Sequence, residues 1–232
     1  MKDRPDKASP NAQPAFLFDL DGTLIDSVYQ HVLAFHEALN AVGVDLPCWA
    51  IHRRIGMSDD LIVPAFARDA GVRLGRKQME RVRELHGEAY MLRVDEVPVL
   101  PGAKTLLKTL KKFGVPYAIG TSSKRERTVK SLKMLGVGED VPVITGDEVS
   151  NAKPNPDLFL ASAAKLKVEI IHCIVIGDSV WDLLAARRAR ALGVGLLCGG
   201  FGEDELIRAG AYRVYRDPED LAGHLDELGV QS

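Results

Sequence analysis

The chain of 232 residues is 46% hydrophobic and 27% charged, and its formal net charge at pH 7 is −2. This balance is ordinary for a globular protein. Because it includes no long run of one charge, it excludes nucleic acid and anionic membranes as expected partners. The length exceeds one typical compact domain, so we expect a core that carries a smaller insert.

The first segment, residues 1–13, is polar and contains prolines, which predicts a disordered tail and not a signal peptide. No apolar stretch of the sequence is long enough to span a bilayer. The three cysteines, Cys48, Cys173 and Cys198, lie far apart, which favours a reducing compartment over a disulfide framework. We therefore expect a cytoplasmic monomer or homodimer that binds neither nucleic acid nor membrane.

Short apolar runs alternate with helical patterns along most of the chain. The runs lie at residues 15–18, 115–119, 141–144, 173–176, 194–197 and, more weakly, 211–215. Helical patterns lie between them at residues 103–113, 125–135, 156–166 and 181–192. Continuous apolar runs are typical of strands buried on both faces of a parallel sheet. The alternation predicts an α/β fold with a doubly wound, Rossmann-like core.

The interval 28–97 interrupts this alternation, because it contains no convincing strand. Val28, Val32 and Phe35 recur at helical spacing, and Gly43 stands where that helix would end. Ser58 predicts a further helix start, although Pro64 would kink that helix or shift its boundary. We expect an all-helical cap at 28–97, inserted between the core segments 14–27 and 98–232.

Polar residues that could take part in catalysis or binding follow four of the apolar runs. In such a sheet, ligands bind at the carboxyl ends of the strands. The four segments are Asp19-Leu20-Asp21-Gly22-Thr23, Thr121-Ser122-Ser123, Lys153-Pro154, and Gly177-Asp178-Ser179 with Asp182. They would bring carboxylates, hydroxyl groups and one lysine to a single edge of the sheet.

These groups are what phosphoryl transfer from a monoester needs. A carboxylate, Asp19, can attack phosphorus, and Asp21 can serve first as general acid and then as general base. Asp178 would complete a Mg²⁺ site with Asp19, while Lys153 neutralises charge. Thr121 would hold phosphoryl oxygens.

The four segments, in this order, resemble the haloacid dehalogenase superfamily, most closely its phosphoglycolate-phosphatase-like branch. The resemblance implies a phosphatase that hydrolyses a small phosphomonoester through a phospho-aspartate, with Mg²⁺ as cofactor and a helical cap. It implies that the carboxylates of Asp19 and Asp178 and the backbone carbonyl of Asp21 bind the metal. Asp182 would orient Lys153 or a metal-bound water, and Gly22, Ser122 and Ser123 would help to bind substrate.

Polar and aromatic residues of the predicted cap could also contact a substrate, although a solvated helix face would explain them equally. They are His31, His36, residues 52–54, His86 and Tyr90. His31 is the best candidate, because it lies within about three helical turns of the Asp-x-Asp loop.

A sugar phosphomutase that resembles β-phosphoglucomutase is the nearest alternative. That family carries Glu-Asp in place of Gly177-Asp178, has no carboxylate corresponding to Asp182, and has an arginine where this chain has Asp59. A dehalogenase would have no use for Asp21.

A phospho-acceptor signalling domain and a non-catalytic binding domain are alternatives of another class. The first needs an aspartate directly after the third strand, and Asp147 is displaced from that position. The second would be expected to lack a motif residue. The substrate stays open among phosphoglycolate, sugar phosphates, nucleotide monophosphates and pyrophosphate.

Overall fold

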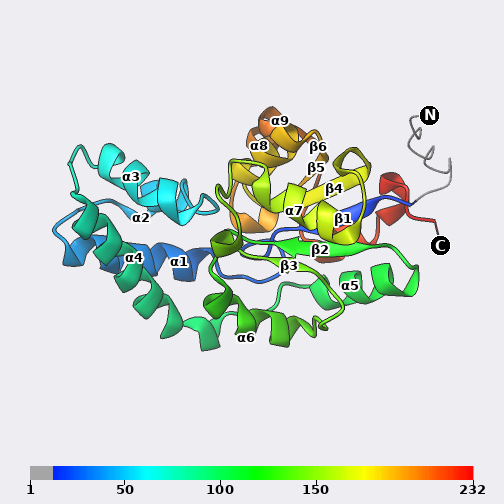
Figure 1. Cartoon of the computed structure of the whole chain (residues 1–232), viewed down its shortest axis with the longest axis horizontal. Coiled ribbons are helices and arrows are strands. Elements are labelled where there is room, and N and C mark those ends of the chain that lie inside the picture. The colour runs from blue at the N-terminus through cyan, green and yellow to red at the C-terminus, as the bar shows by residue number, and fades with distance from the viewer. Residues whose placement is uncertain (1–12, 232) are drawn as a thin grey trace, which may run out of the picture.

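The computed structural model describes residues 13–231, so the predicted tail lies outside the described residues except for Gln13. Its centre is a six-stranded, wholly parallel sheet in the order β3-β2-β1-β4-β5-β6 (Figure 1). The strands are β1 (Ala15–Phe18), β2 (Tyr117–Gly120), β3 (Val143–Ile144), β4 (Cys173–Gly177), β5 (Leu192–Leu196) and β6 (Ala211–Tyr215). The strand order reverses beside β1, and this reversal opens a crevice for ligands.

Helices cover both faces of the sheet, which confirms the doubly wound core. The helices on one face are α5 (Ala103–Lys112), α6 (Arg125–Leu135) and α10 (Pro218–Ala222), and those on the other are α7 (Asp157–Leu166), α8 (Val180–Ala189) and α9 (Glu203–Ala209) (Figure 1). Within β1, Phe16 and Phe18 pack toward the first group, whereas Ala15 and Leu17 pack toward the second. Burial on both faces explains why the run is continuously apolar.

Several predicted boundaries are wrong: the strands predicted at 115–119, 141–144 and 194–197 are Tyr117–Gly120, Val143–Ile144 and Leu192–Leu196 in the structure. The helix predicted at 181–192 ends at Ala189, where Arg190 takes a left-handed conformation with φ 65°, and Leu192 already belongs to β5. Strand β5 pairs with both β4 and β6, and this pairing outweighs the helical spacing of Leu192. Strand β2 begins at Tyr117, after Pro116, which has no N–H to donate to the ladder.

The interval 28–97, here called the helical insert, contains α1 (Val28–Ala41), α2 (Cys48–His52), α3 (Asp59–Asp69), α4 (Arg76–Met91) and a short 3₁₀ turn (Val94–Glu96). Its apolar residues, among them Phe35, Phe66 and Val82, form a hydrophobic cluster of their own. Pro64 lies inside α3 and does not end it. In Figure 1 these helices lie at one end of the molecule, beyond the strand ends where α1 begins.

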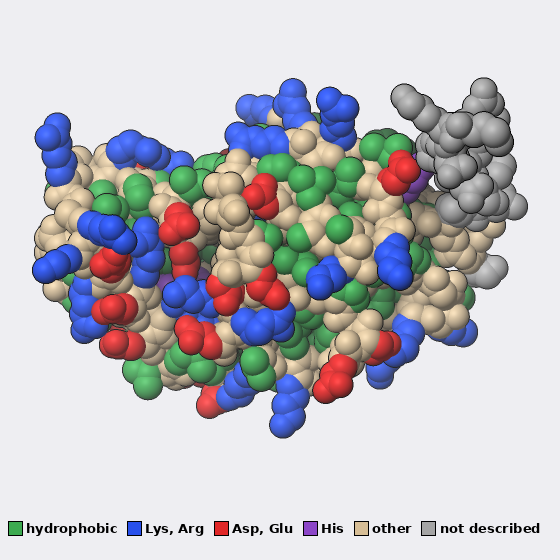
Figure 2. All heavy atoms as spheres, in the orientation of Figure 1, with side chains coloured by type: hydrophobic (Ala, Val, Ile, Leu, Met, Phe, Trp, Pro, Cys, Tyr) green, Lys and Arg blue, Asp and Glu red, His purple; other side chains and the backbone are tan. Residues whose placement is uncertain are grey.

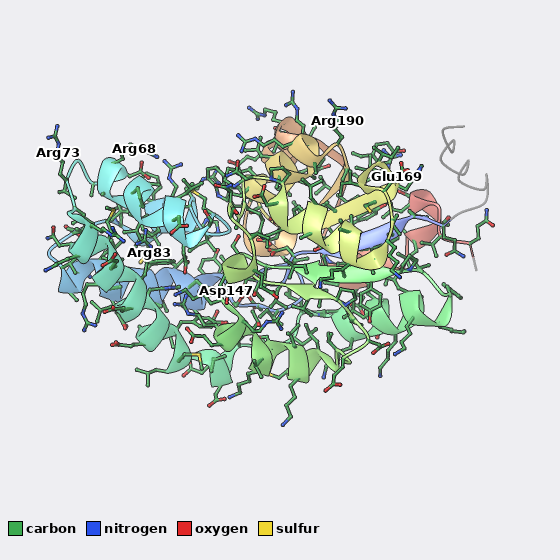
Figure 3. All side chains as sticks on the ribbon, viewed as in Figure 1. Arg68, Arg73, Arg83, Asp147, Glu169 and Arg190 are labelled. Carbon is green, nitrogen blue, oxygen red and sulfur yellow. The ribbon has the colours of Figure 1, made fainter. Side chains whose placement is uncertain are left out.

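The surface carries charges of both signs. Figure 2 shows acidic and basic side chains interspersed over the viewed face. In Figure 3 Asp147 lies beyond β3, where the core meets the helical insert. It is exposed, and it accepts a hydrogen bond from the backbone N–H of Arg125 at 3.1 Å. Over residues 13–231, none of the helices has the length and apolar character needed to cross a lipid bilayer.

Candidate active site

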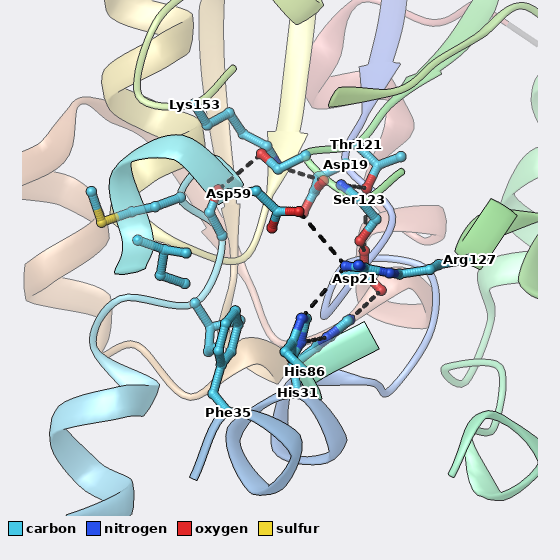
Figure 4. Close-up of a pocket in the computed structure, with 15 residues that line it drawn as sticks. Asp19, Asp21, His31, Phe35, Asp59, His86, Thr121, Ser123, Arg127 and Lys153 are labelled. Carbon is cyan, nitrogen blue, oxygen red and sulfur yellow. Dashed lines mark hydrogen bonds and ion pairs between the residues drawn. The ribbon is translucent and has the colours of Figure 1, made fainter. Parts of the chain in front are cut away.

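The predicted catalytic residues meet at the carboxyl edge of the sheet. Asp19, Thr121 and Asp178 directly follow β1, β2 and β4, and the register pairs Phe18 with both Ile119 and Ile176, so the three strands end within one residue of one another. The loop after β3 brings Lys153 to the same place. One pocket is lined by Asp19, Asp21, Thr121, Ser122, Ser123 and Lys153 together with residues of the helical insert (Figure 4).

Lys153 is the buried cation of this site, with 1% of its surface exposed. Its ammonium donates hydrogen bonds to Asp19 and, at 2.8 Å, to Oδ1 of Asp182. The other oxygen of Asp182, Oδ2, accepts hydrogen bonds from the backbone N–H and the hydroxyl of Ser179. Asp182 is therefore held from both sides and aims Lys153 at Asp19.

Three buried carboxylates surround this single lysine. Carboxylate oxygens of Asp19, Asp178 and Asp182 lie within 4.8 Å of one another. Burial raises the pKa of Asp19 to about 8 against the opposing effect of Lys153, and burial together with the other two carboxylates raises the pKa of Asp178. Three negative charges and one positive charge leave a net charge of −2, which is costly to bury.

A divalent cation fits this charge and these ligands, since Mg²⁺ prefers carboxylate oxygens. Both oxygens of Asp182 are already engaged, so Asp19 and Asp178 are the residues that would hold it. Thr23 orients Asp178 by donating a hydrogen bond to its Oδ1 at 2.8 Å.

Glycines permit the close approach of two loops to Asp178. Gly22 has φ 84°, and a Cβ there would lie 2.5 Å from Oδ2 of Asp178 and 2.6 Å from Cγ2 of Val28. A Cβ on Gly199 would lie 1.8 Å from the same Asp178 oxygen. Gly22 was expected to bind substrate, but it does not line the pocket and instead makes room for Asp178. The role of Gly199 beside Asp178 was not predicted, because a Gly-Gly pair after a strand is too common to indicate a particular site.

Replacing Gly22 by alanine is expected to destabilise the protein more than the same change at Gly43. Gly43 has a similar φ of 79° but nothing within 4 Å of a built Cβ. Gly43→Ala should therefore cost only left-handed strain, about 1–2 kcal/mol. Gly22→Ala adds a clash with Asp178 worth roughly 1–3 kcal/mol more. Urea unfolding of both variants measures the difference, and equal losses would contradict the role of Gly22 at Asp178.

Asp21 accepts hydrogen bonds from both the core and the start of the helical insert. The donors are Ser123 at 2.8 Å, Thr121 at 3.2 Å, Ser27 at 2.7 Å and His31 at 3.2 Å. Burial opposes ionisation, but the hydrogen bonds from His31, Ser27 and Ser123 lower the pKa of Asp21 below its usual range. These hydrogen bonds favour the ionised form of Asp21, which is the form that a general base needs.

His31 lines the pocket, in agreement with its choice as the best candidate of the helical insert. It is buried, stacks on Tyr90, and its Nδ1 lies 3.1 Å from Nε2 of His86. Arg127 Nη1 lies 3.5 Å from the second nitrogen of His86. Because a guanidinium only donates, the donors run in one direction, from Arg127 through His86 and His31 to Asp21.

Four other candidate residues of the helical insert, Arg53, Arg54, His36 and His52, do not line this pocket. Arg53 pairs with Glu205 and lies over the ring of Phe201. Arg54 forms hydrogen bonds with Asp69 at 2.7 and 2.9 Å. His36 and His52 do not line the pocket either, and His52 lies 2.8 Å from the carbonyl oxygen of Gly199. We therefore do not assign these side chains to substrate contact.

Two charged residues of the pocket were not predicted as site residues from the sequence. Asp59, the first residue of α3, was noted only as a departure from the mutases. Arg127 on α6 belongs to the segment Lys124-Arg125-Glu126-Arg127, which is typical of a solvated helix face. Both side chains reach the pocket (Figure 4).

The chain was compared with known proteins. A family model described as haloacid dehalogenase-like hydrolase matches residues 14–190. This chain belongs to the haloacid dehalogenase-like hydrolases. A hydrolase from Pseudomonas syringae has a crystal structure that is 49% identical, covers 93% of this chain and 99% of its own, and superposes with a TM-score of 0.90.

Curated relatives within the family are named as phosphatases with different substrates. A phosphoglycolate phosphatase from Pectobacterium atrosepticum is 33% identical over 192 residues, which are 80% of this chain and 81% of the relative. Hexitol phosphatase B from Escherichia coli is 28% identical over 79% of this chain and 83% of the relative. A β-phosphoglucomutase structure from Clostridium difficile is 25% identical, covers 94% of this chain and 97% of its own, and has a TM-score of 0.82. The family assignment is confirmed, and the relatives differ in what they act on.

Proposed function

We propose that this hydrolase is a Mg²⁺-dependent phosphatase that cleaves a small phosphomonoester through a phospho-aspartate on Asp19. The observation that carries the proposal is the position of Asp19. Its carboxylate lies at the base of the pocket, with Lys153 bonded to it and with Asp21 and Thr121 lining the same pocket. A nucleophile, a fixed cation and a proton-transfer group thus face one small space.

The reaction follows from these side chains. An oxygen of Asp19 attacks phosphorus, the ester P–O bond breaks, and the leaving oxygen takes a proton from the protonated carboxyl of Asp21. Water then attacks the acyl phosphate, Asp21 accepts its proton, and inorganic phosphate leaves. Lys153 and the Thr121 hydroxyl hold the phosphoryl oxygens. When bound, Mg²⁺ would offset the charge of Asp19, Asp178 and the phosphoryl group and so keep Asp19 ionised.

Asp21 has to change hydrogen-bond partners during this cycle. Its four hydrogen-bond donors all favour the ionised carboxylate. That form can accept a proton from water during hydrolysis of the acyl phosphate, but it cannot donate one to the leaving oxygen in the first step. His31 and Ser27 stand in the helical insert and at its junction with the core, so a movement of the insert would release part of this set. Asp21 would then take up the proton that the leaving oxygen needs.

The helical insert is assigned the role of a cap over the catalytic core. Two hydrogen bonds tie it to catalytic loops: the Ser58 N–H donates to the carbonyl of Lys153 at 2.8 Å, and the Ser122 hydroxyl donates to that of Gly56 at 3.2 Å. A cap in this position excludes water from the reacting group and contacts the leaving group. The division into core 14–27 and 98–232 and cap 28–97 follows from this role, and the free cysteines fit the proposed cytoplasmic location.

A phosphatase is favoured over a phosphomutase by the pair Gly177 and Asp182. A Cβ on Gly177 would lie 2.3 Å from Cβ of Asp182. The aspartate that orients Lys153 therefore requires glycine at 177, and a glutamate at 177 would not fit beside it. The presence of Gly177 and the presence of Asp182, the two differences from the mutases, therefore depend on each other sterically.

Mg²⁺ is expected to be required for phosphate release. Chelator should silence the enzyme and added Mg²⁺ should restore it. Asp178→Asn should raise the Mg²⁺ concentration for half-maximal activity at least about tenfold, because it removes a charged ligand. Asp147→Asn, outside the cluster, is the matched control and should behave as wild type. Phosphorus NMR with a sugar phosphate distinguishes released phosphate from an isomerised ester. Full activity in excess chelator, or isomerised ester as the main product, would refute the proposal.

A further inference from the structure

Asp59 and Arg127 reach the pocket from different parts of the molecule. Asp59 comes from α3 of the helical insert and Arg127 from α6 of the core, and Nη1 of Arg127 lies 3.7 Å from Oδ2 of Asp59. Figure 4 shows the two charged groups facing each other in the pocket, between Asp19 on one side and His31 and His86 on the other. This is the space that the non-reacting part of a substrate would enter.

Arg127 is built into the pocket and is not a surface residue. Its side chain is 6% exposed and packs over α4 at Gly87, where a Cβ would lie 2.7 Å from Nη2. In the described part of the chain, the contact of 3.5 Å with His86 is the one side-chain hydrogen bond that its guanidinium makes. Five N–H donors are therefore held in place with most of their capacity unused.

Asp59 has unused hydrogen-bonding capacity as well. Its backbone is fixed, because Nε of Arg83 donates to its carbonyl oxygen at 2.9 Å. Its side-chain Oδ2 is buried, yet among residues 13–231 it has no hydrogen-bond partner. A buried carboxylate oxygen without a donor is costly, so a group that donates to it would stabilise the site.

We propose that Asp59 and Arg127 bind the leaving group of the substrate and select hydroxylated phosphomonoesters, of polyols or sugars, over carboxylated ones. This inference rests on the proposed phosphatase function and names its substrate class. A hydroxyl group placed between the two residues donates to Asp59 and accepts from Arg127, so it satisfies both. Phe35 and Ile62, which line the pocket beside the pair, suit the aliphatic face of such a leaving group.

A carboxylated leaving group satisfies only one partner. It could accept from Arg127, but it would bring a second negative charge next to the carboxylate of Asp59 in a site with little water. Like charges at such a distance disfavour binding. A leaving group with neither function leaves Asp59 and Arg127 with only their long contact of 3.7 Å to each other and the contact of Arg127 with His86. Sites built to hydrogen-bond a hydroxyl discriminate strongly against analogues that lack it.

The test compares kcat/KM for sorbitol 6-phosphate, 2-phosphoglycolate and p-nitrophenyl phosphate, with Mg²⁺ present. For the wild type we expect sorbitol 6-phosphate to exceed 2-phosphoglycolate by about a hundredfold or more. Asp59→Asn keeps the shape and removes the charge, so this ratio should fall by roughly tenfold or more. The p-nitrophenyl ester should change least, and inhibition by inorganic phosphate, which reports on the core site, should change less than the ratio.

Asp60→Asn is the matched control, because Asp60 is the next residue, is exposed and does not line the pocket. It should leave the ratio as in the wild type. Arg127→Gln should lower kcat/KM for sorbitol 6-phosphate more than for the p-nitrophenyl ester, and thermal unfolding checks that this variant is folded. A wild-type preference for 2-phosphoglycolate, or an equal effect of Asp59→Asn on all three esters, would overturn the inference. If the wild type hydrolyses none of the three esters, p-nitrophenyl phosphate included, the phosphatase function itself is refuted.

Discussion

Replacing Asp19 by asparagine is expected to lower kcat by at least about a thousandfold, because an amide oxygen cannot form the acyl phosphate. The fold should persist, since asparagine has the same shape and can still accept a hydrogen bond from Lys153. The measurement is phosphate release at saturating substrate, with mass spectrometry to exclude deamidation. With the wild type, rapid acid quench during turnover should trap a phosphorylated protein, and with Asp19→Asn it should not.

Asp147→Asn is the control for this experiment. Asp147 is also an aspartate that follows a strand, but it accepts its hydrogen bond from Arg125 and does not line the catalytic pocket. Among the aspartates of this chain, Asp147 lies nearest to the position of the phosphorylated aspartate in a phospho-acceptor signalling domain. Near-normal turnover by Asp19→Asn, or loss of phosphorylation in Asp147→Asn, would show that Asp19 is not the nucleophile.

Replacing Lys153 by methionine is expected to abolish activity and to destabilise the protein by about 3–5 kcal/mol. Lys153 is the cation that compensates Asp19, Asp178 and Asp182, and without it these buried carboxylates must either take up protons or stay charged at a high cost. Burial alone would lower its pKa, but Asp182 and Asp19 raise it overall, so the lysine stays charged at neutral pH. The measurement is urea unfolding at pH 7.5 in chelator, combined with an activity assay.

Two comparisons identify the cause of this destabilisation. Mg²⁺ should stabilise Lys153→Met more than wild type, since a cation at Asp19 and Asp178 replaces part of the lost charge. Lys111→Met is the matched control, because Lys111 pairs with Asp140 at 2.9 Å on the surface; this variant should change stability little. Equal unfolding free energies for Lys153→Met and wild type would mean that the carboxylates are compensated in another way.

The core of the fold and of the site could be predicted because the signals are local in sequence. A strand buried on both faces must be apolar throughout, so β1, β2 and β4 can be recognised in the sequence as short apolar runs. Whatever residue follows such a run lies at the carboxyl edge of the sheet. Asp19, Thr121 and Asp178 could thus be placed by adjacency alone.

The same local reasoning failed where competing interactions decide the outcome. The spacing of Leu192 fits a helix, but pairing of β5 with two neighbours places it in a strand. His86 and Arg127 look like polar residues of solvated helices, yet both are buried, because the side chain of Arg127 on α6 packs directly against α4 at Gly87 and His86.

The sequence by itself determined the α/β class, the helical interval after the first strand, and the placement of Asp19, Asp21, Lys153 and Asp178 at one edge of the sheet. Each of these depends on periodicity or on a position next to a strand end. Only the tertiary structure decided that Asp59 and Arg127 meet in the pocket. Asp59 and Arg127 stand on separate helices, and their meeting depends on how the insert packs on the core. That packing is set by many distributed apolar contacts, none of which carries a signal at residue 59 or 127.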